Sequence, residues 1–189
     1  MLGLGNNLIH SNKVRNRIIN YISDFTSDND NWVKNPITIP QSLHIGTPTV
    51  TANQSIDGTD GWLKVVYAAN QTYGGIFQRD LFPPPQKYRV SDTVIASLKI
   101  YLYHDGSTDH WEGTDDVQVK FSSGYGNGPE SQVSIPLNTS TTISFEDDIT
   151  SFAPHNYYTD LHITFNSASD TPQAGAIFYI KDCTVEVWR

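Results

Sequence analysis

Cysteine is almost absent from this chain of 189 residues, since Cys183 is the only one. No disulfide can form within the chain, so the fold must be held together by its core and not by covalent cross-links. Cys183 lies in an alternating run that continues to Val187, and this position is typical of a small core residue and not of a reactive thiol. The length of the chain suits a single domain.

Basic residues are also scarce, because 12 Lys and Arg stand against 20 Asp and Glu, which gives a net charge of −8. A surface with this charge repels phosphate groups, so nucleic acid and anionic membranes are not expected as partners. No apolar run approaches the ~20 residues of a membrane span. The start of the chain has neither the basic segment nor the cleavage site of a signal peptide.

Catalytic motifs are missing as well. The sequence contains no glycine-rich phosphate loop, no HExxH, no GxSxG and no paired cysteines for zinc. Its four Glu are predicted at loops, strand edges or an outward face, and the carboxylate separation that glycoside hydrolysis requires cannot be read from a sequence. The protein is therefore predicted not to be an enzyme.

The chain is rich in short segments that alternate apolar and polar residues, with Gly, Pro, Asn and Asp between them. No amphipathic helix of three turns and no parallel β-α-β rhythm occurs. The pattern predicts an all-β fold, an antiparallel β-sandwich or jelly roll. The expected strands are Ile18–Ile22, Trp62–Ala68, Ile76–Leu81, Val94–Tyr103, Val117–Phe121, Val133–Leu137, Ile143–Phe145, Leu161–Phe165 (with His162 outward) and Cys183–Val187.

Residues 1–17 are predicted to be an N-terminal anchoring segment, and residues 18–189 the β-sandwich. The tip Met1–Ile9 is apolar and glycine-rich and resembles no packed element. Such a segment is either a frayed terminus or a peptide that becomes ordered on a partner, and both interpretations stay open.

The loop 104–116 is the most unusual segment, because Trp111 stands there among five acidic residues. An exposed indole amid hydrogen-bonding groups would serve as a platform for a sugar ring; the alternative is that Trp111 folds back onto the sandwich edge. Asp105 and Asp109 alternate as oxygen ligands do in calcium loops, although the spacing matches no complete calcium motif.

Two tyrosines of the clearest strand, Tyr101 and Tyr103, are predicted on the face opposite its apolar stripe. They would join Trp62 or Tyr125 in a groove that binds a glycan. The same rings could equally be ordinary outward aromatics or part of a subunit interface. With Trp111, these four residues are the candidate glycan-binding residues.

Several features occur in a fixed order along residues 18–189. They are an Asp-Phe turn leading to a Trp (Asp24-Phe25, Asn31-Trp32), a strand with Gln (Gly75–Gln78 to Leu81), a Tyr before a long apolar strand (Lys87-Tyr88), and an apolar-aromatic strand, an Asp and a final strand (Ile177–Asp182, Thr184–Trp188). This order resembles the jelly-roll carbohydrate-binding modules attached to xylanases and cellulases. The resemblance implies glycan binding and a structural calcium ion between the first and last strands, with Asp182 and the backbone near Asp24 as ligands. Thr26 stands where the family often has an acidic residue.

The opening MLGLGNNL resembles the starts of tailed-phage structural proteins, whose particles commonly carry such sandwiches. This resemblance implies a non-catalytic virion component, such as a capsid decoration, fibre or tail protein. It would assemble in the host cytoplasm and then be extracellular. Its N-terminal segment would contact other virion proteins, while the sandwich binds a cell-surface or polymeric glycan. One alternative is a free-standing carbohydrate-binding module of a polysaccharide-degrading system. Another is a purely structural homo-oligomer without a ligand.

Overall fold

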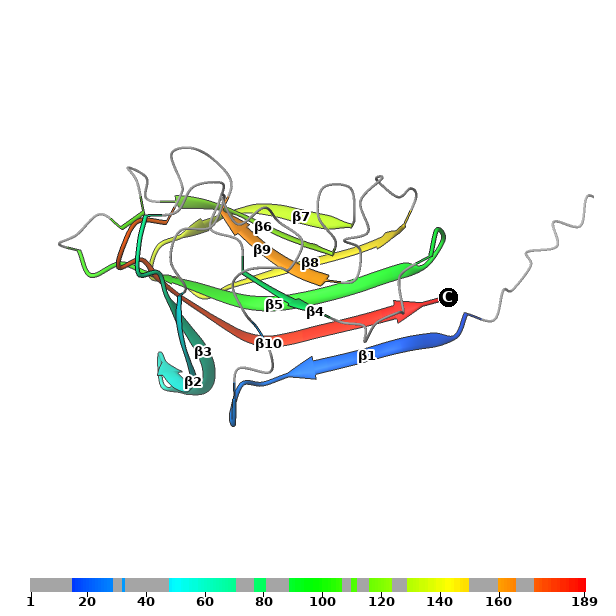
Figure 1. The fold of residues 1–189 in the computed structure, drawn as a ribbon, viewed down its shortest axis with the longest axis horizontal. Coiled ribbons are helices and arrows are strands. Elements are labelled where there is room, and N and C mark those ends of the chain that lie inside the picture. The colour runs from blue at the N-terminus through cyan, green and yellow to red at the C-terminus, as the bar shows by residue number, and fades with distance from the viewer. Residues whose placement is uncertain are drawn as a thin grey trace, which may run out of the picture.

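The computed structural model describes residues 15–28, 32, 48–70, 77–80, 89–106, 110–111, 116–123, 129–149, 160–165 and 172–189. In these ranges the regular secondary structure consists of β-strands (Figure 1). None of these residues belongs to a helix long and apolar enough to cross a bilayer. Residues 1–14 lie outside the described residues, so the anchoring segment stays a prediction.

The strands form two antiparallel sheets that lie one over the other (Figure 1). The larger sheet has the order β2 (Thr49–Ile56), β3 (Thr59–Val66), β10 (Ile177–Trp188), β5 (Thr93–Tyr103) and β8 (Thr141–Asp148), and β1 (Arg17–Ser23) also pairs with β10. The smaller sheet has the order β4 (Phe77–Asp80), β9 (Asp160–Phe165), β6 (Asp116–Ser123) and β7 (Glu130–Pro136). The chain is the all-β antiparallel sandwich that the alternating pattern predicts.

The core lies between the sheets and follows from the period of two along each strand. On β5 every second residue from Val94 to Leu102 is buried. Phe165 of the smaller sheet packs against Phe178 of the larger one, with ring centroids 5.3 Å apart. Cys183 is buried in the same core, as its alternating context predicts.

Strand β10 runs through the middle of the larger sheet and changes its neighbour halfway (Figure 1). Its first residues, Ile177–Ile180, pair with β3, and its second half pairs with β1, while β5 accompanies it on the other side. The change occurs at an irregularity between Lys181 and Thr184, where Asp182 has φ 51. The sequence interpretation of two strands separated by an Asp is therefore corrected: they are one strand with a bulge, since Asp tolerates this backbone conformation.

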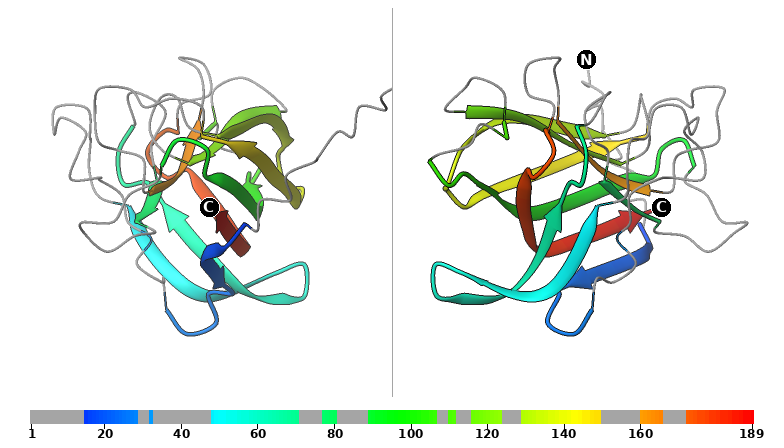
Figure 2. Two further views of the ribbon diagram at one scale, coloured as in Figure 1. Left: turned by 90° about the vertical axis from the view of Figure 1, so that its right-hand side faces the viewer. Right: turned by 60° about the vertical axis from the view of Figure 1, so that its left-hand side comes forward.

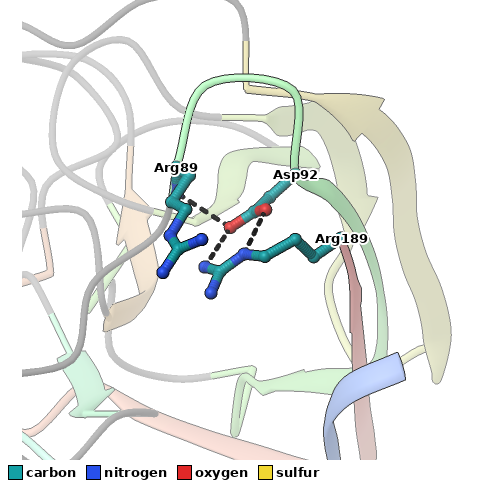
Figure 3. Close-up of polar contacts among 3 residues, drawn as sticks. All are labelled: Arg89, Asp92 and Arg189. Carbon is teal, nitrogen blue, oxygen red and sulfur yellow. Dashed lines mark hydrogen bonds and ion pairs between the residues drawn. The ribbon is translucent and has the colours of Figure 1, made fainter. Parts of the chain in front are cut away.

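The two ends of the described sandwich are held together by the backbone. The Asn16 and Arg189 N–H groups each donate to the other residue's carbonyl oxygen at 2.9 Å. A buried ion pair lies next to them (Figure 3): the Asp92 carboxylate accepts from Arg189 Nε at 2.9 Å and Nη2 at 2.8 Å, and from the Arg89 backbone N–H at 2.7 Å. The Asp92 hydrogen bond raises the pKa of Arg189, so this bridge fixes the end of β10 against the start of β5.

Two further points compare the sequence with the structure. Strand β2 was not predicted, because Ala52 and Gln54 weaken the apolar side of its alternation, although its half-buried positions do recur with a period of two. His162 lies on the face of β9 opposite the core residues Leu161 and Ile163, as predicted. Only 2% of it is exposed, so this outer position is covered.

Candidate functional site

Aromatic side chains gather on the outer face of the larger sheet, which faces away from the core. Trp62 of β3, Tyr101 of β5 and Tyr179 of β10 form a cluster separate from the main core, which we call the aromatic cluster. Tyr101 and Tyr179 are direct cross-strand partners, and their rings meet edge to face with centroids 6.0 Å apart. The strand period places them outward, because their neighbours Ile100 and Ile180 point into the core.

The members of the cluster are much less exposed than Tyr103, which lies beside them. Trp62, Tyr101 and Tyr179 are only 3%, 8% and 9% exposed, whereas Tyr103, two residues along β5, is 38% exposed. Such low values on an outer sheet face require a cover, and Ile56 at the end of β2 is one residue that packs on the cluster. Tyr103 is therefore the part of this surface that solvent reaches most easily.

The turn between β2 and β3 carries part of this cover. Asp57 and Gly58 have φ values of 49° and 73°, the combination of a type I′ hairpin turn. After burial, the charge of Asp57 is the next largest cause that raises the pKa of Tyr101, so this turn lies within electrostatic range of the Tyr101 hydroxyl. In Figure 2 the hairpin, coloured cyan to teal, curls away from the other strands of its sheet.

The base of this hairpin is fixed by a close backbone contact. A Cβ atom on Gly61 would lie 2.7 Å from the Asp24 carbonyl oxygen, and Gly61 has φ +84. Only glycine satisfies both the contact and the conformation. The strand that carries Trp62 is thus held against the end of β1.

Asn138, in the turn between β7 and β8, borders the cluster on its other side. Its Oδ1 accepts from the His104 backbone N–H at 2.8 Å, and its Nδ2 donates to the His104 carbonyl at 2.8 Å. The Tyr101 hydroxyl lies 3.4 Å from the same Oδ1. The amide is therefore oriented by the backbone and offers Tyr101 a long, weak hydrogen bond.

The tyrosine hydroxyls lie close enough to affect one another. Burial, and after it the neighbouring phenols including Tyr103, raises the pKa of Tyr179, and burial is also the main cause that raises the pKa of Tyr101. Both phenols therefore stay protonated at neutral pH. A protonated hydroxyl can donate one hydrogen bond and accept others, which is what recognition of a polyhydroxylated ligand requires.

Trp62 carries the one unusual polar atom of this site. Its indole Nε1–H is buried and has no hydrogen-bond partner. A buried donor without an acceptor costs about 1–3 kcal/mol, so folded proteins seldom keep one without a reason. The site thus holds a donor that an acceptor from outside the chain could satisfy.

Lysines flank the cluster on the same face. Lys64 is the cross-strand partner of Tyr179 on β3, and Lys99 and Lys181 are partners of each other. Lys99 forms an ion pair with Asp182 at 2.7 Å, and Lys181 Nζ donates to the Asp60 carbonyl. The charge of Lys99 is therefore compensated locally.

Trp111 is not an exposed platform, which corrects the first of the two sequence interpretations. It is 1% exposed, its ring centroid lies 5.0 Å from that of Phe165, and its Nε1 donates to the Tyr103 carbonyl at 3.0 Å. The ring folds back onto the sandwich edge, and the backbone of Trp111 forms an isolated antiparallel bridge with Pro172. Of the other candidates, Tyr125 and Asp109 lie outside the described residues.

Two of the acidic candidates lie close together. Ser23 pairs with Cys183, so Asp24 and Asp182 follow directly beyond the last paired residues of β1 and β10. Asp182 pairs with the ammonium of Lys99, and Asp24 accepts from the backbone N–H and hydroxyl of Thr26, which lower its pKa. Asp105 lies exposed beyond β5. The described residues include no group of three or more His, Cys, Asp or Glu that could hold a metal ion, and a calcium ion at Asp24 and Asp182 stays a prediction.

The sequence placed Tyr101 and Tyr103 on the outward face and named Trp62 as a partner, and the structure brings Trp62 and Tyr101 together. It missed Tyr179. The alternation in Ile177–Lys181 could have placed this ring outward, but its position beside Tyr101 depends on the register of β10 against β5.

No protein-family model and no curated protein sequence matches the chain. Solved structures do match. The C-terminal family 22 carbohydrate-binding module of Clostridium thermocellum Xyn10B has a TM-score of 0.52 and 14% identity, covering 88% of this chain and 92% of that chain. The CBM22-2 xylan-binding domain of Paenibacillus barcinonensis Xyn10C has a TM-score of 0.48 and 14% identity, covering 87% of this chain and 97% of that chain.

A third match is the arabinose-bound α-L-arabinofuranosidase MgGH51, with a TM-score of 0.47 and 14% identity over 82% of this chain. This chain spans only 25% of that enzyme's length. The match to the Clostridium module shows that the chain has the fold of a carbohydrate-binding module.

Proposed function

We propose that this protein is a non-catalytic carbohydrate-binding module that binds a polysaccharide on the outer face of its larger sheet. The observation that carries the proposal is the buried, unpaired Nε1–H of Trp62 inside a cluster of tyrosine rings and hydroxyls. A sugar combines an apolar ring face, which packs on aromatic side chains, with hydroxyls that accept and donate hydrogen bonds. It would supply both the stacking partner and the missing acceptor.

Access to Trp62 requires a local movement. Tyr103, at 38% exposed, is the first contact for a ligand, and the Asp57-Gly58 turn must shift to uncover the rings behind it. A Cβ on Gly58 would have no atom within 4 Å, so there is open space beside the turn. Binding would then exchange the packing of Ile56 on the cluster for the packing of a sugar ring.

The fold supports the module over the virion component that the opening residues suggest. The sandwich has the fold of a carbohydrate-binding module, whereas the virion interpretation depends on residues 1–17, of which only the last three belong to the described part. The structural homo-oligomer is the competing proposal from another class. It needs the outer face to be a subunit interface, so light scattering that shows a stable oligomer without glycan affinity would favour it.

The proposal is tested by calorimetric titration of the full chain with soluble xylan, mixed-linkage glucan and galactomannan, preceded by a glycan array. We expect Tyr103→Ala to lower affinity for the bound polymer by about tenfold, since an aromatic contact is worth about 0.5–1.5 kcal/mol beyond its area. Tyr103→Phe keeps the ring and should lose less. Val90→Ala is the matched control, because Val90 is exposed and lies outside the cluster. A blank array, or equal affinities for Tyr103→Ala and the control, contradicts the proposal.

A further inference from the structure

Apart from the aromatic cluster and Tyr103, one more aromatic residue of β10 lies on the same outer face, at the far end of the strand. Beyond the bulge the outward residues of this strand are Thr184, Glu186 and Trp188, and Trp188 is half-buried. Its cross-strand partner on β5 is Thr93, whereas Tyr179 at the other end pairs with Tyr101. One strand thus carries an outward aromatic ring at each of its ends.

The Trp188 ring is held in place by charged neighbours. Glu186 accepts from Trp188 Nε1 with Oε2 at 3.1 Å and from Arg17 Nη1 with Oε1 at 2.9 Å. The Arg17 guanidinium carbon lies 5.9 Å from the centroid of the indole ring, a cation–π arrangement. A fixed indole beside a carboxylate and a guanidinium presents a stacking surface with hydrogen-bonding groups at its edge.

This arrangement remains accessible to a ligand. The Arg17 and Glu186 side chains are 45% and 33% exposed, so the ion pair lies at the surface, where such a pair adds little to stability. Backbone pairing already fixes β1 against β10 from Arg17 to Ser23. The Arg17–Glu186 ion pair is therefore not needed to hold β1 in place, and its position beside the indole calls for another explanation.

The spacing between the two aromatic positions suits a chain and not a single sugar. Nine residue steps separate Tyr179 from Trp188, which at ~3.3 Å per residue is about 30 Å along the strand. The outward residues between them are Lys181, Thr184 and Glu186 on β10 and Lys99, Ser97 and Ile95 on β5. The two carboxylates along this path are paired, Asp182 with Lys99 and Glu186 with Arg17. An extended, uncharged polymer fits such a path better than a polyanion.

We infer that Trp188 with Arg17 and Glu186 forms a second subsite for the same polysaccharide, and that the protein prefers long chains that span β10 over short oligosaccharides. The inference rests on the proposed function. A chain that occupies the aromatic cluster raises the effective concentration of its own distant units at Trp188. Affinity should then increase with chain length until both positions are occupied.

The test compares xylotriose and cellotriose with soluble xylan and soluble mixed-linkage glucan by titration calorimetry. For wild type we expect the polymer to bind at least about tenfold more tightly per chain segment than the trisaccharide of the same kind. Trp188→Ala should remove this difference and leave trisaccharide affinity unchanged, while Tyr103→Ala should weaken both. Trp188→Phe, which keeps an aromatic ring, should retain most of the preference.

The outcomes separate the two proposals. If trisaccharides and polymers bind wild type equally per segment, or if Trp188→Ala keeps the length preference, the second subsite is refuted and the aromatic cluster remains. If Trp188→Ala weakens short and long ligands equally, Trp188 acts through the fold and the inference fails too. If no ligand binds wild type at all, the proposed function itself is refuted. If Trp188→Ala fails to fold, the wild-type comparison still refutes the second subsite when trisaccharide and polymer bind equally.

Discussion

The buried bridge between Asp92 and Arg189 offers a sharp test of how the end of β10 is held. Asp92 is 1% exposed and receives two guanidinium hydrogen bonds and one backbone hydrogen bond. Asp92→Ala removes both acceptor oxygens and with them all three of these hydrogen bonds. Breaking a buried ion pair from one side costs about 3–5 kcal/mol.

The expected value lies at the low end of that range. The Arg189 side chain is 31% exposed, so water can replace part of what it loses. We therefore expect Asp92→Ala to lower the free energy of unfolding by about 3 kcal/mol, and Tm by roughly 6–12 °C for a domain of this size. Asp92→Asn keeps the shape but loses the charge, and should cost about half as much.

Urea denaturation followed by tryptophan fluorescence measures these changes, provided that the m-value stays constant. Glu130→Gln is the matched control, because Glu130 pairs with Lys120 on the surface and should cost no more than about 1 kcal/mol. A double-mutant cycle with Arg189→Met then isolates the coupling between Asp92 and Arg189. The reasoning is refuted if Asp92→Ala is no less stable than the control, or if the cycle shows no coupling.

Three further predictions concern stability and titration. Trp111→Ala should lower the free energy of unfolding by about 3–5 kcal/mol, measured in urea, because the ring is buried; unchanged stability would contradict its place in the core. Thr26→Val removes the hydroxyl hydrogen bond to Asp24 and should move the lowered pKa of Asp24 towards its ordinary value, measured by carbon NMR titration. In wild type the stability linked to this carboxylate is present above the ordinary pKa and is lost as pH falls through the lowered pKa. Because the pKa values of Tyr101 and Tyr179 are raised, the unfolded phenols ionise first, and the free energy of unfolding falls as pH rises past about 10. Replacing both tyrosines by Phe should reduce this alkaline loss, measured by chemical denaturation at a series of pH values.

The parts of the fold that sequence reasoning recovers are those with a local signal. Strand β5 has an apolar residue at every second position from Val94 to Leu102, so both its core face and the outward position of Tyr101 and Tyr103 follow from the period of two. Strand β2 carries a weaker signal, since its half-buried positions are Val, Ala, Gln and Ile between Thr, Asn and Ser, and Ala and Gln interrupt the apolar stripe.

The parts of the site that were missed depend on contacts between distant segments. Trp111 looks exposed in its acidic loop because its partners, Phe165 and the Tyr103 carbonyl, come from other strands. Tyr179 joins Tyr101 only through the register of two strands that are far apart in the chain. Neither contact has a signature within a short window of sequence, whereas the outward position of Tyr179 does, because its strand alternates.

The pairing of the first strand with the last has a mechanical consequence. Because β1 and β10 are antiparallel and Asn16 bonds to Arg189, the two ends of the sandwich leave from the same point. A force that pulls these ends apart would load the interstrand hydrogen bonds one after another, starting at Asn16, like opening a zipper. If this domain is tethered at both ends and its outer face holds a polymer, a low force would separate β1 from β10. The strands that carry the aromatic cluster would stay paired.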